Sequence, residues 1–364
     1  MFRIEIKNSY VFLLIILISI LSFFCSYQNK KDNKWYKGNT HAHTVLCGHA
    51  DSSPSAVAKW YHDHGYNFLI LSEHNKFINP DTVKLPENRR PDFILIPGEE
   101  VTGKKVIHTT AMNIDSLVDW NFDHEHKSEI IQYHVNETIK SNGTPILNHP
   151  NYKWAVSALD ILPVKKLHHF ELFNGHPLVQ NEGDKTHHST EKIWDILLSS
   201  GMAVYGISSD DAHHFQTWDH NHSNPGRGWV MVSAYELTSD AITTAMKNGD
   251  FYASNGVILS DISKTNNKYS VTVNESATQK ELSSSILKGK IIENGKEGYR
   301  IECIGDAGKI LFSENSTFAS YNIGNSNSYV RCKITYTRKK DNNFEEFYAW
   351  TQPVFTDDRL TKIR

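Results

Sequence analysis

The sequence contains few cysteines, few prolines and only one long run of apolar residues. Its 364 residues include 4 cysteines, 11 prolines and 20 glycines. A collagen-like chain needs far more glycine and proline, and a polytopic membrane protein needs several long apolar runs. Hydrophobic residues make up 39% of the chain, which excludes a disordered protein and is enough to form a sizeable core in one large domain or two.

Positive charge is scarce in the middle of the chain. Residues 41–255 carry 16 basic and 26 acidic side chains, whereas residues 1–40 carry 6 and 2, and residues 256–364 carry 16 and 13. An acidic segment of this size repels the phosphate backbone of nucleic acids. We therefore expect no stable nucleic-acid partner.

The first 33 residues have the pattern of a signal peptide or of a lipoprotein or membrane anchor. Arg3 and Lys7 precede an apolar run at 11–24, and lysines follow directly. The run is short for a membrane span, which needs about 20 residues, so a cleaved signal is expected and a single-span anchor is the alternative. Cys25 stands where a lipoprotein carries its acylated cysteine. We expect an exported, periplasmic or outer-surface protein that is lipid-anchored through Cys25 and touches a membrane only there.

Residues 34–255 alternate short apolar strands with capped helices. The expected strands are 68–71, 93–96, 145–147, 170–173, 203–207 and 229–232, and the expected helices are 55–64, 127–141, 190–200 and 239–248. Repeated strand–helix units imply a parallel sheet, and about seven of them imply a barrel. The pattern predicts an α/β fold, with a (β/α)7 barrel if the units close; the resemblance given below implies a distorted barrel of this kind.

Residues 256–364 show no further helical pattern. Short alternating strands are expected at 269–273, 298–303, 309–312, 329–336 and 347–350, separated by turn-rich stretches. This pattern predicts a small antiparallel β-sandwich as a second domain. Cys303 and Cys332 both fall in this part and could pair in an oxidising compartment.

The distribution of histidine points to metal chemistry. All 20 histidines lie between His41 and His222. His41 and His43 end a predicted strand, where side chains at i and i+2 point to one face. Imidazole is a common ligand of zinc, iron and manganese. A lone His-x-His pair is weak evidence, since a structural pair would look the same.

Other predicted strands end in similar groups. The strand-end motifs are Ser72-Glu73-His74, Glu99-Glu100, Asn148-His149 and Asp210-Asp211-Ala212-His213. Barrels place catalytic groups at strand exits, so the repetition favours one shared site over separate structural roles. Cys47 lies among these histidines and could touch a metal site, or it could be a small buried residue.

In combination and order, these motifs resemble the PHP (polymerase and histidinol phosphatase) superfamily of metal-dependent hydrolases, which are distorted seven-stranded barrels holding up to three divalent metals. The resemblance covers about residues 36–255. It rests on the segments 39–44, 65–75, 97–102, 148–150 and 209–213. A narrower similarity, to the carbaryl-hydrolase-like (CehA/McbA-type) branch, rests on 170–175, 226–230, 249–256 and 349–354.

The PHP resemblance implies ligands for two or three divalent ions of zinc, manganese or iron. One ion would be held by His41, His43, Glu100 and Asp211; a second by Glu100, His108 and His149; and a third by His49, His74 and His213. Glu73 departs from the family pattern, in which an aspartate usually precedes the histidine. Glu99 leaves the bridging carboxylate uncertain by one residue, although the spacing after Pro97-Gly98 favours Glu100.

The same resemblance implies hydrolysis by a hydroxide shared between metal ions, because metal coordination lowers the pKa of water. Glu100 and Asp211 would hold that centre, His176 would line the pocket, and Arg227 would bind an anionic group near the mouth. A phosphoesterase acting on a small-molecule or oligomeric phosphoester is the main expectation, because a third ion suits a phosphate. A carboxylic or carbamate ester hydrolase of the CehA/McbA type is one alternative, and a non-catalytic envelope binding protein is another.

Overall fold

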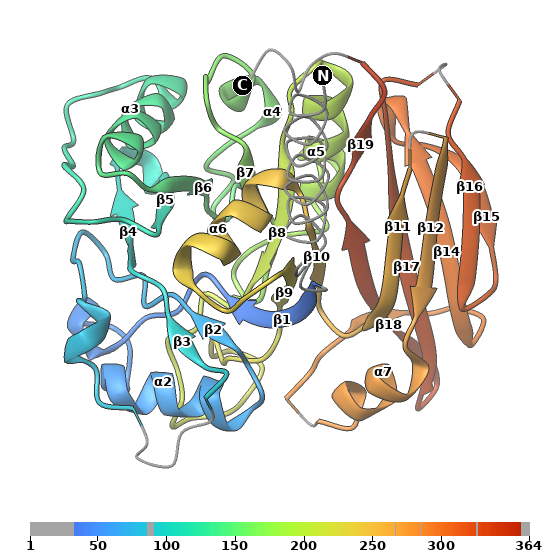
Figure 1. The fold of residues 1–364 in the computed structure, drawn as a ribbon, viewed down its shortest axis with the longest axis horizontal. Helices are drawn as coiled ribbons and strands as arrows, with labels where there is room; N and C mark the ends of the chain where they lie inside the picture. Colours follow the sequence, from blue (N-terminus) through green and yellow to red (C-terminus); the bar gives the residue numbers. More distant parts are fainter. Residues whose placement is uncertain (1–32, 86–90, 266, 285, 325–326, 358–364) are drawn as a thin grey trace, which may run out of the picture.

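The computed structural model describes residues 33–85, 91–265, 267–284, 286–324 and 327–357, so the predicted signal segment with Cys25 lies outside the described residues. Figure 1 shows a mixed α/β part, coloured blue to yellow, beside an all-β part in orange and red. Within these residues, none of the helices combines the length and hydropathy that a bilayer span requires. The predicted α/β class is confirmed.

The α/β part contains the expected strands and helices in the expected order. Its strands are β1 (Lys34–Asn39), β2 (Phe68–Leu69), β3 (Ile94–Leu95), β4 (Gly98–Thr102), β5 (His108–Met112), β6 (Thr144–Leu147), β7 (His169–Asn174), β8 (Tyr205–Ser209), β9 (Trp229–Ala234) and β10 (Phe251–Ser254). Its helices are α2 (Pro54–Asp63), α3 (Lys127–Lys140), α4 (Ala158–Ile161), α5 (Thr190–Ser199) and α6 (Ser239–Asn248), with 3₁₀ turns η1 (Val45–Cys47), η2 (Pro80–Thr82) and η3 (Lys104–Val106).

Capping residues explain why the helix bounds were predictable. The side chains of Ser53, Ser189 and Thr238 each accept a hydrogen bond from the backbone N–H three residues on, which satisfies a donor that the first helical turn leaves free. Gly249 ends α6 in the left-handed conformation that glycine adopts without steric cost. The four predicted helices are therefore found within one residue of their expected bounds.

The all-β part contains the expected strands and one helix that the sequence pattern missed. The elements are β11 (Leu259–Lys264), β12 (Lys268–Val273), α7 (Glu275–Leu282), β13 (Lys290–Ile292), β14 (Gly298–Gly305), η4 (Asp306–Gly308), β15 (Lys309–Glu314), β16 (Phe318–Asn322), β17 (Tyr329–Lys340), β18 (Asn343–Thr351) and β19 (Val354–Phe355). The expectation of no helix after residue 256 was wrong. The Asn274 side chain caps α7, which buries only Thr278 and Leu282 and so has little apolar periodicity.

The strands of the α/β part form a ring that is less regular than the predicted barrel. β1, β2 and β3 pair in parallel, as do β6, β7 and β8, but β4–β5 and β5–β6 are antiparallel. Two isolated parallel bridges, Ala42↔Ala212 and His74↔Glu100, connect the two groups. These pairings therefore do not form a closed barrel of seven parallel strand–helix units. Between β4 and β5, a hairpin turn through η3 takes the place of a crossover helix.

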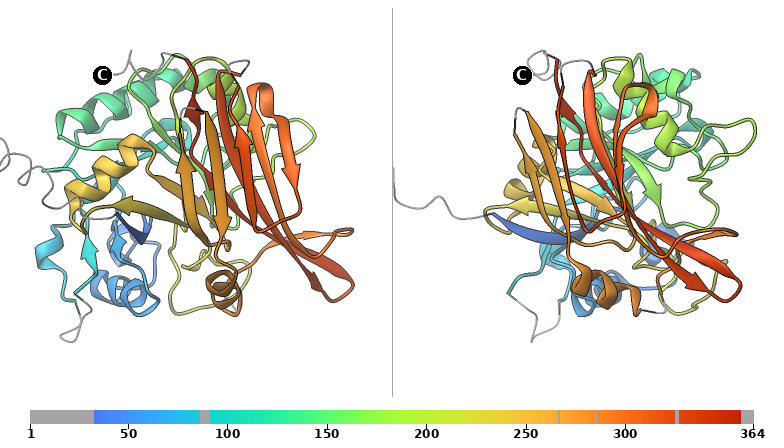
Figure 2. Two further views of the ribbon diagram at one scale, coloured as in Figure 1. Left: turned by 45° about the vertical axis from the view of Figure 1, so that its right-hand side comes forward. Right: turned by 90° about the vertical axis from the view of Figure 1, so that its right-hand side faces the viewer.

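One sheet runs through both parts of the molecule. Its order is β15-β14-β17-β18-β10-β9-β1-β2-β3, and β11-β12-β16 form a separate three-stranded sheet. Figure 2 shows the two sheets of the all-β part facing each other. Because β10 pairs with both β9 and β18, backbone hydrogen bonds continue across residue 255, the predicted domain boundary.

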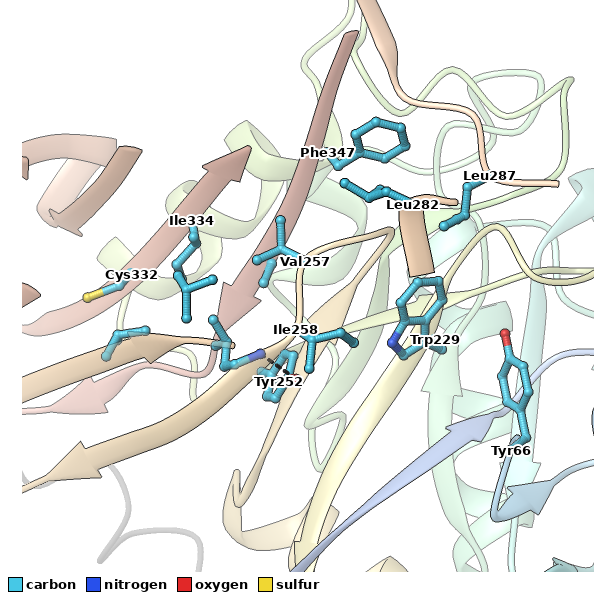
Figure 3. Packing of buried hydrophobic residues seen from close by; sticks show 14 of the residues in the cluster. Tyr66, Trp229, Tyr252, Val257, Ile258, Leu282, Leu287, Cys332, Ile334 and Phe347 are labelled. Carbon is cyan, nitrogen blue, oxygen red and sulfur yellow. Dashed lines mark hydrogen bonds between the residues drawn. The ribbon is translucent and has the colours of Figure 1, made fainter. Parts of the chain in front are cut away.

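Buried side chains fill the junction between the two parts. Trp229 and Tyr252, from β9 and β10, belong to the same apolar cluster as Ile334 and Phe347, from β17 and β18 (Figure 3). Burying side chains of this size stabilises the fold by roughly 1.5–3 kcal/mol each. The all-β part is thus packed against the α/β part as well as paired with it.

Cys303 and Cys332 stand directly opposite each other in the register of β14 and β17. Both side chains are buried, and both are free thiols. The two cysteines therefore lie side by side in the structure, but they do not form the disulfide that the sequence allowed.

A buried ion pair also joins the two parts. Arg331 of β17 donates from Nε and Nη2 to the two carboxylate oxygens of Asp195 in α5, at 3.0 Å each, and the Tyr329 hydroxyl donates to the same carboxylate at 3.0 Å. The guanidinium also lies over the Trp194 ring, 4.7 Å from its centroid. Arg331 is 1% exposed, so this contact is shielded from solvent.

Candidate metal centre

The bridge between Ala42 and Ala212 brings the ends of β1 and β8 together. His43 N–H donates to the Ala212 carbonyl (2.9 Å), and Asp211 N–H donates to the His41 carbonyl (3.0 Å). Along a strand-like segment, the residues directly before and after a given residue lie on the same face. The neighbours of the two bridged alanines therefore share one face. The backbone thereby places His41 and His43 against Asp211 and His213.

Glu100 lies at the centre of the predicted ligands. The second bridge, His74↔Glu100, and the β4–β5 pairing set its position. Imidazole nitrogens lie 2.7–3.5 Å from its two carboxylate oxygens, and they belong to His41, His43, His74, His108 and His149. Glu100 is fully buried. A single carboxylate is thus surrounded by five histidines from four different segments of the chain.

Asp211 and His49 complete the group. Asp211 Oδ1 lies 3.3 Å from His41 Nε2 and 3.5 Å from His43 Nε2, and it lies 3.6 Å from His213 Nδ1. His213 Nε2 in turn lies 3.0 Å from His49 Nε2. The nine residues predicted as metal ligands therefore form one continuous cluster.

The spacing within the cluster fits donors that share cations. Two nitrogen or oxygen ligands bound about 2.1 Å from one ion lie about 3.0 Å apart at a right angle and about 3.4 Å apart at a tetrahedral angle. The donor atoms of several triads all lie within 4.8 Å of one another, among them His41–His43–Glu100, His41–His149–Asp211 and His43–His74–His213. The residues present thus fit a centre that holds more than one divalent ion.

Hydrogen bonds at the far ring nitrogens show which ring nitrogens are unprotonated. The Nδ1 atoms of His49 and His213 face the backbone carbonyls of Cys47 (3.2 Å) and Asp211 (3.0 Å). A carbonyl oxygen only accepts, so each Nδ1 is the donor, as in the tautomer whose Nε2 presents a lone pair. Two such lone pairs 3.0 Å apart repel each other unless a cation lies between them. His41 Nδ1 donates to Glu171 at 2.8 Å, so His41 Nε2, which lies 3.1 Å from His43 Nε2, is the nitrogen of that ring that faces the other ligands.

Several buried polar atoms of the cluster lack hydrogen bonds. Among the described residues, Glu100 Oε2, His43 Nδ1 and His149 Nδ1 have no hydrogen-bond partner. Glu100 Oε2 lies 2.7 Å from His74 Nδ1, but without the orientation of a hydrogen bond. Buried polar atoms are rarely left unsatisfied in folded proteins. Glu100 Oε2, at the centre of the cluster, is therefore a buried carboxylate oxygen that a bound cation would satisfy.

The electrostatics keep the carboxylates ionised. Burial would raise the pKa of Glu100, but the imidazoles of His108, His41 and His74 together hold it well below its usual value. Burial opposes ionisation of Asp211 in the same way, and His41 and His43 hold the pKa of Asp211 well below normal. Negative charge is therefore available to bind cations.

The histidines differ in protonation. Burial lowers the pKa of His43 to about 4, and burial and His43 hold the pKa of His213 well below normal, so both rings are neutral near pH 7. Burial also disfavours protonation of His41, but Asp211, Glu171 and Glu100 together raise the pKa of that ring well above normal. In the metal-free state, a proton on His41 therefore balances part of the negative charge that a bound cation would balance.

Two residues of the cluster have strained backbones. Asp211 has φ 51° and His149 has φ 23°, in the left-handed region that side chains other than glycine rarely adopt. Such strain costs about 1–3 kcal/mol per residue and is concentrated at functional sites. Both residues donate a backbone N–H within the site, Asp211 to the His41 carbonyl and His149 to the Glu171 carboxylate at 2.7 Å.

Glu99 points away from the cluster. Its Oε1 accepts from the Val118 N–H at 2.6 Å, and burial raises its pKa to about 7. Strand alternation in β4 separates it from Glu100, as the sequence predicted. Of the two neighbours, Glu100 is the one that meets the histidines.

The two residues predicted to contact substrate have different environments. The His176 ring lies with its centroid 5.9 Å from that of His213, and its Nδ1 accepts from the Leu178 N–H at 3.1 Å. Arg227 is 7% exposed, and its guanidinium donates to the carbonyls of Gly175 and Asp219 and to the Asn224 side chain. These contacts hold the loop that follows His213. The role of Arg227 as an anion-binding group stays a prediction.

Three residues that contact the ligands, Glu171, Asn148 and Asn174, were not predicted from the motifs. Glu171 binds His41 and His149, Asn148 donates to Glu100 at 2.8 Å, and Asn174 donates to both Glu171 and Asp211. Outer residues of this kind orient metal ligands. A usable signal was present, because Glu171 interrupts the apolar run of a strand that is buried almost throughout.

Comparison with known proteins places few limits on the function. No protein-family model matches the chain, and no curated protein matches it. Among solved structures, it is similar to a two-domain protein from Bacteroides vulgatus that contains a predicted PHP-like metal-dependent phosphoesterase. The TM-score is 0.42 and the identity 14%, over 87% of this chain and 95% of that chain. The PHP resemblance stays a prediction from the motifs.

Proposed function

We propose that this protein is a metal-dependent hydrolase that cleaves phosphoesters. The observation that carries the proposal is the arrangement around Glu100, where five imidazoles surround one buried carboxylate, and beside it the Nε2 atoms of His49 and His213 face each other at 3.0 Å. Divalent ions bound there would lower the pKa of a coordinated water and polarise the ester. Zinc, manganese and iron all suit such nitrogen and oxygen donors.

The chain's own residues would prepare the site in three ways. Glu100 and Asp211 supply the negative charge that balances bound cations, and their lowered pKa values keep that charge in place at neutral pH. Glu171 fixes the orientation and protonation of His41. His176, whose Nδ1 accepts a backbone hydrogen bond, presents Nε2–H when neutral, and burial lowers its pKa. We propose that this N–H donates to a substrate oxygen.

A phosphoester is favoured over a carboxylic or carbamate ester by the extent of the donor cluster. The donors continue beyond Glu100 and Asp211 to His74, His213 and His49. A substrate with several anionic oxygens can contact all the cations of such an extended centre, whereas a carboxylic ester offers one carbonyl oxygen. The geometry therefore suits phosphate best.

The test is hydrolysis of three chromogenic esters by the full chain loaded with Mn²⁺ or Zn²⁺. We expect p-nitrophenyl phosphate or bis-p-nitrophenyl phosphate to be cleaved, and Asp211→Asn to abolish the cleavage. His188→Ala, which removes an exposed histidine outside the cluster, is the matched control and should retain activity. Cleavage of p-nitrophenyl acetate alone would favour the carboxylic ester hydrolase. Bound metal without cleavage of any of the three would favour the binding protein.

A further inference from the structure

We propose that Cys47 supplies a thiolate ligand to the cation held by His49 and His213, which makes this end of the metal centre a mixed sulfur–nitrogen site. The proposal rests on the metal centre of the proposed function, but not on its phosphoesterase activity. The motifs behind the PHP resemblance do not include Cys47 among the metal ligands. The proposal adds it to them, and it predicts which metals this end of the centre prefers.

Geometry groups the Cys47 sulfur with two sets of donors. The ligand atoms of Cys47, His49 and His213 all lie within 4.8 Å of one another, and so do those of Cys47, His43 and Glu73. The sulfur is thus within reach of donors on more than one side. A zinc ion bound to sulfur at about 2.3 Å and to nitrogen at about 2.1 Å separates those ligands by less than this limit.

Independent observations in the same place point to a cation. The lone pairs of His49 Nε2 and His213 Nε2 face each other at 3.0 Å, and His213 is 6% exposed. Within the part of the chain that the structure describes, Glu73 Oε2 is also buried without a hydrogen-bond partner, while Glu73 Oε1 accepts from the Thr44 N–H at 2.6 Å. Glu73 is fully buried. A bound cation next to the Cys47 thiol would remove the repulsion between the two lone pairs and would give the unpaired carboxylate oxygen a partner.

The local backbone holds the sulfur in place. Cys47 ends η1, which the Thr44 side chain caps and which Gly48 terminates in the left-handed conformation. The Cys47 carbonyl accepts from His49 Nδ1, so the turn that positions the sulfur also orients the imidazole. A cysteine that only filled space would not need this arrangement.

The alternative is that Cys47 is a small, half-buried residue of the turn. Its surroundings argue against this role. Cys303 and Cys332 show what structural cysteines look like in this protein, since both are buried in an apolar core with other thiol or aliphatic neighbours. Cys47 instead lies beside imidazoles and a carboxylate.

X-ray absorption at the zinc edge of the Zn²⁺-loaded full chain tests the proposal without measuring turnover. We expect a sulfur scatterer at about 2.3 Å from zinc in addition to nitrogen and oxygen at about 2.0–2.1 Å. Cys47→Ser should remove the sulfur signal. The matched control Cys303→Ala removes a thiol from the sheet core and should leave the signal unchanged.

The same variants should differ in metal preference. Cys47→Ser should weaken the binding of one Zn²⁺ by at least about tenfold, since even the loss of an outer-shell partner costs that much. The change for Mn²⁺ should be much smaller, because manganese prefers oxygen and nitrogen over thiolate. Zinc bound without a sulfur signal in the wild type, or a signal that persists in Cys47→Ser, would overturn the proposal while leaving the metal centre intact. A protein that binds Mn²⁺ but no Zn²⁺ would overturn this proposal alone, and a protein that binds neither ion would overturn both this proposal and the proposed function.

Discussion

The Glu171 carboxylate accepts the Nδ1–H of His41 at 2.8 Å, although the two residues are 130 positions apart in the sequence. The same carboxylate accepts from the His149 N–H at 2.7 Å and from Asn174 at 2.8 Å. One buried side chain of β7 therefore fixes a ring that follows β1 and a backbone turn after β6. This makes Glu171 a positioning residue for two predicted ligands that themselves surround Glu100.

Replacement of Glu171 by Gln should weaken metal binding by about 10–100-fold. The amide introduced at position 171 would place an N–H donor next to His41, His149 or Asn174, which already donate to this position. The hydrogen bonds that orient His41 therefore cannot all be kept. Competition with a chromophoric chelator measures the affinity. The matched control is Glu191→Gln, in which a carboxylate at the start of α5 is changed outside the cluster. Wild-type metal affinity in Glu171→Gln would contradict the positioning role.

Substitutions of Asp211 should separate charge from backbone conformation. Asp211→Asn and Asp211→Ala both remove the carboxylate, so both should abolish metal-dependent turnover. Asn tolerates the left-handed backbone at this position (φ 51°), whereas Ala should destabilise the fold by about 1–2 kcal/mol relative to Asn. Urea denaturation of the metal-free variants measures the difference. Activity retained in Asp211→Asn would mean that this carboxylate does not hold the catalytic ion.

Local features of the fold could be predicted because local interactions determine them. The caps at Ser53, Ser189 and Thr238 and the stop at Gly249 are each made within one turn of chain, so the pattern of α2, α5 and α6 predicted their bounds. Alternation along a strand predicted that only one of Glu99 and Glu100 faces inward, and the spacing after Pro97-Gly98 favoured Glu100. Helix α7 was missed because its few buried residues leave no periodic signal.

Features that depend on distant parts of the chain could not be predicted. The antiparallel hairpin of β4 and β5 places Glu100 within a strand, where the sequence suggested a strand exit. Contacts of Glu171 and Asn148 with the ligands join segments that meet only in the folded chain. Likewise, the sheet that continues through β10 into the all-β part depends on pairings between residues about 100 positions apart. Residue type predicted which groups gather at the candidate site, whereas topology decides which other groups contact them.

The buried histidine of β7 should make stability depend on pH. His169 donates from Nε2 to the Met246 carbonyl at 3.0 Å, and burial lowers its pKa to about 4. In the unfolded chain its pKa is about 6.5, so the unfolded state binds more protons between the two values. The contribution of His169 is therefore complete above pH 6.5 and is lost as the pH falls through about 4.

Denaturation of wild type and His169→Phe in chelator measures this contribution. The difference in unfolding free energy between the two should fall by about 3 kcal/mol from pH 7 to pH 4. Proton binding by the metal ligands is common to both proteins and cancels. His188→Gln, at an exposed position, is the control and should leave the pH dependence of the wild type unchanged. A difference that is constant with pH would show that His169 titrates normally.

The ion pair between Arg331 and Asp195 should matter most when only one partner is removed. In Arg331→Met, the Tyr329 hydroxyl is what remains of the side-chain partners that the structure describes for the buried Asp195 carboxylate. The substitution should lower the free energy of unfolding by about 3–5 kcal/mol, measured by guanidinium denaturation. The double variant Arg331→Met/Asp195→Leu removes both charges, and apolar pairs often replace buried ion pairs at little cost. It should therefore recover most of the lost stability. If the double variant is as unstable as the single one, the pair acts through its hydrogen-bond geometry and packing on Trp194, and not through the balance of buried charge.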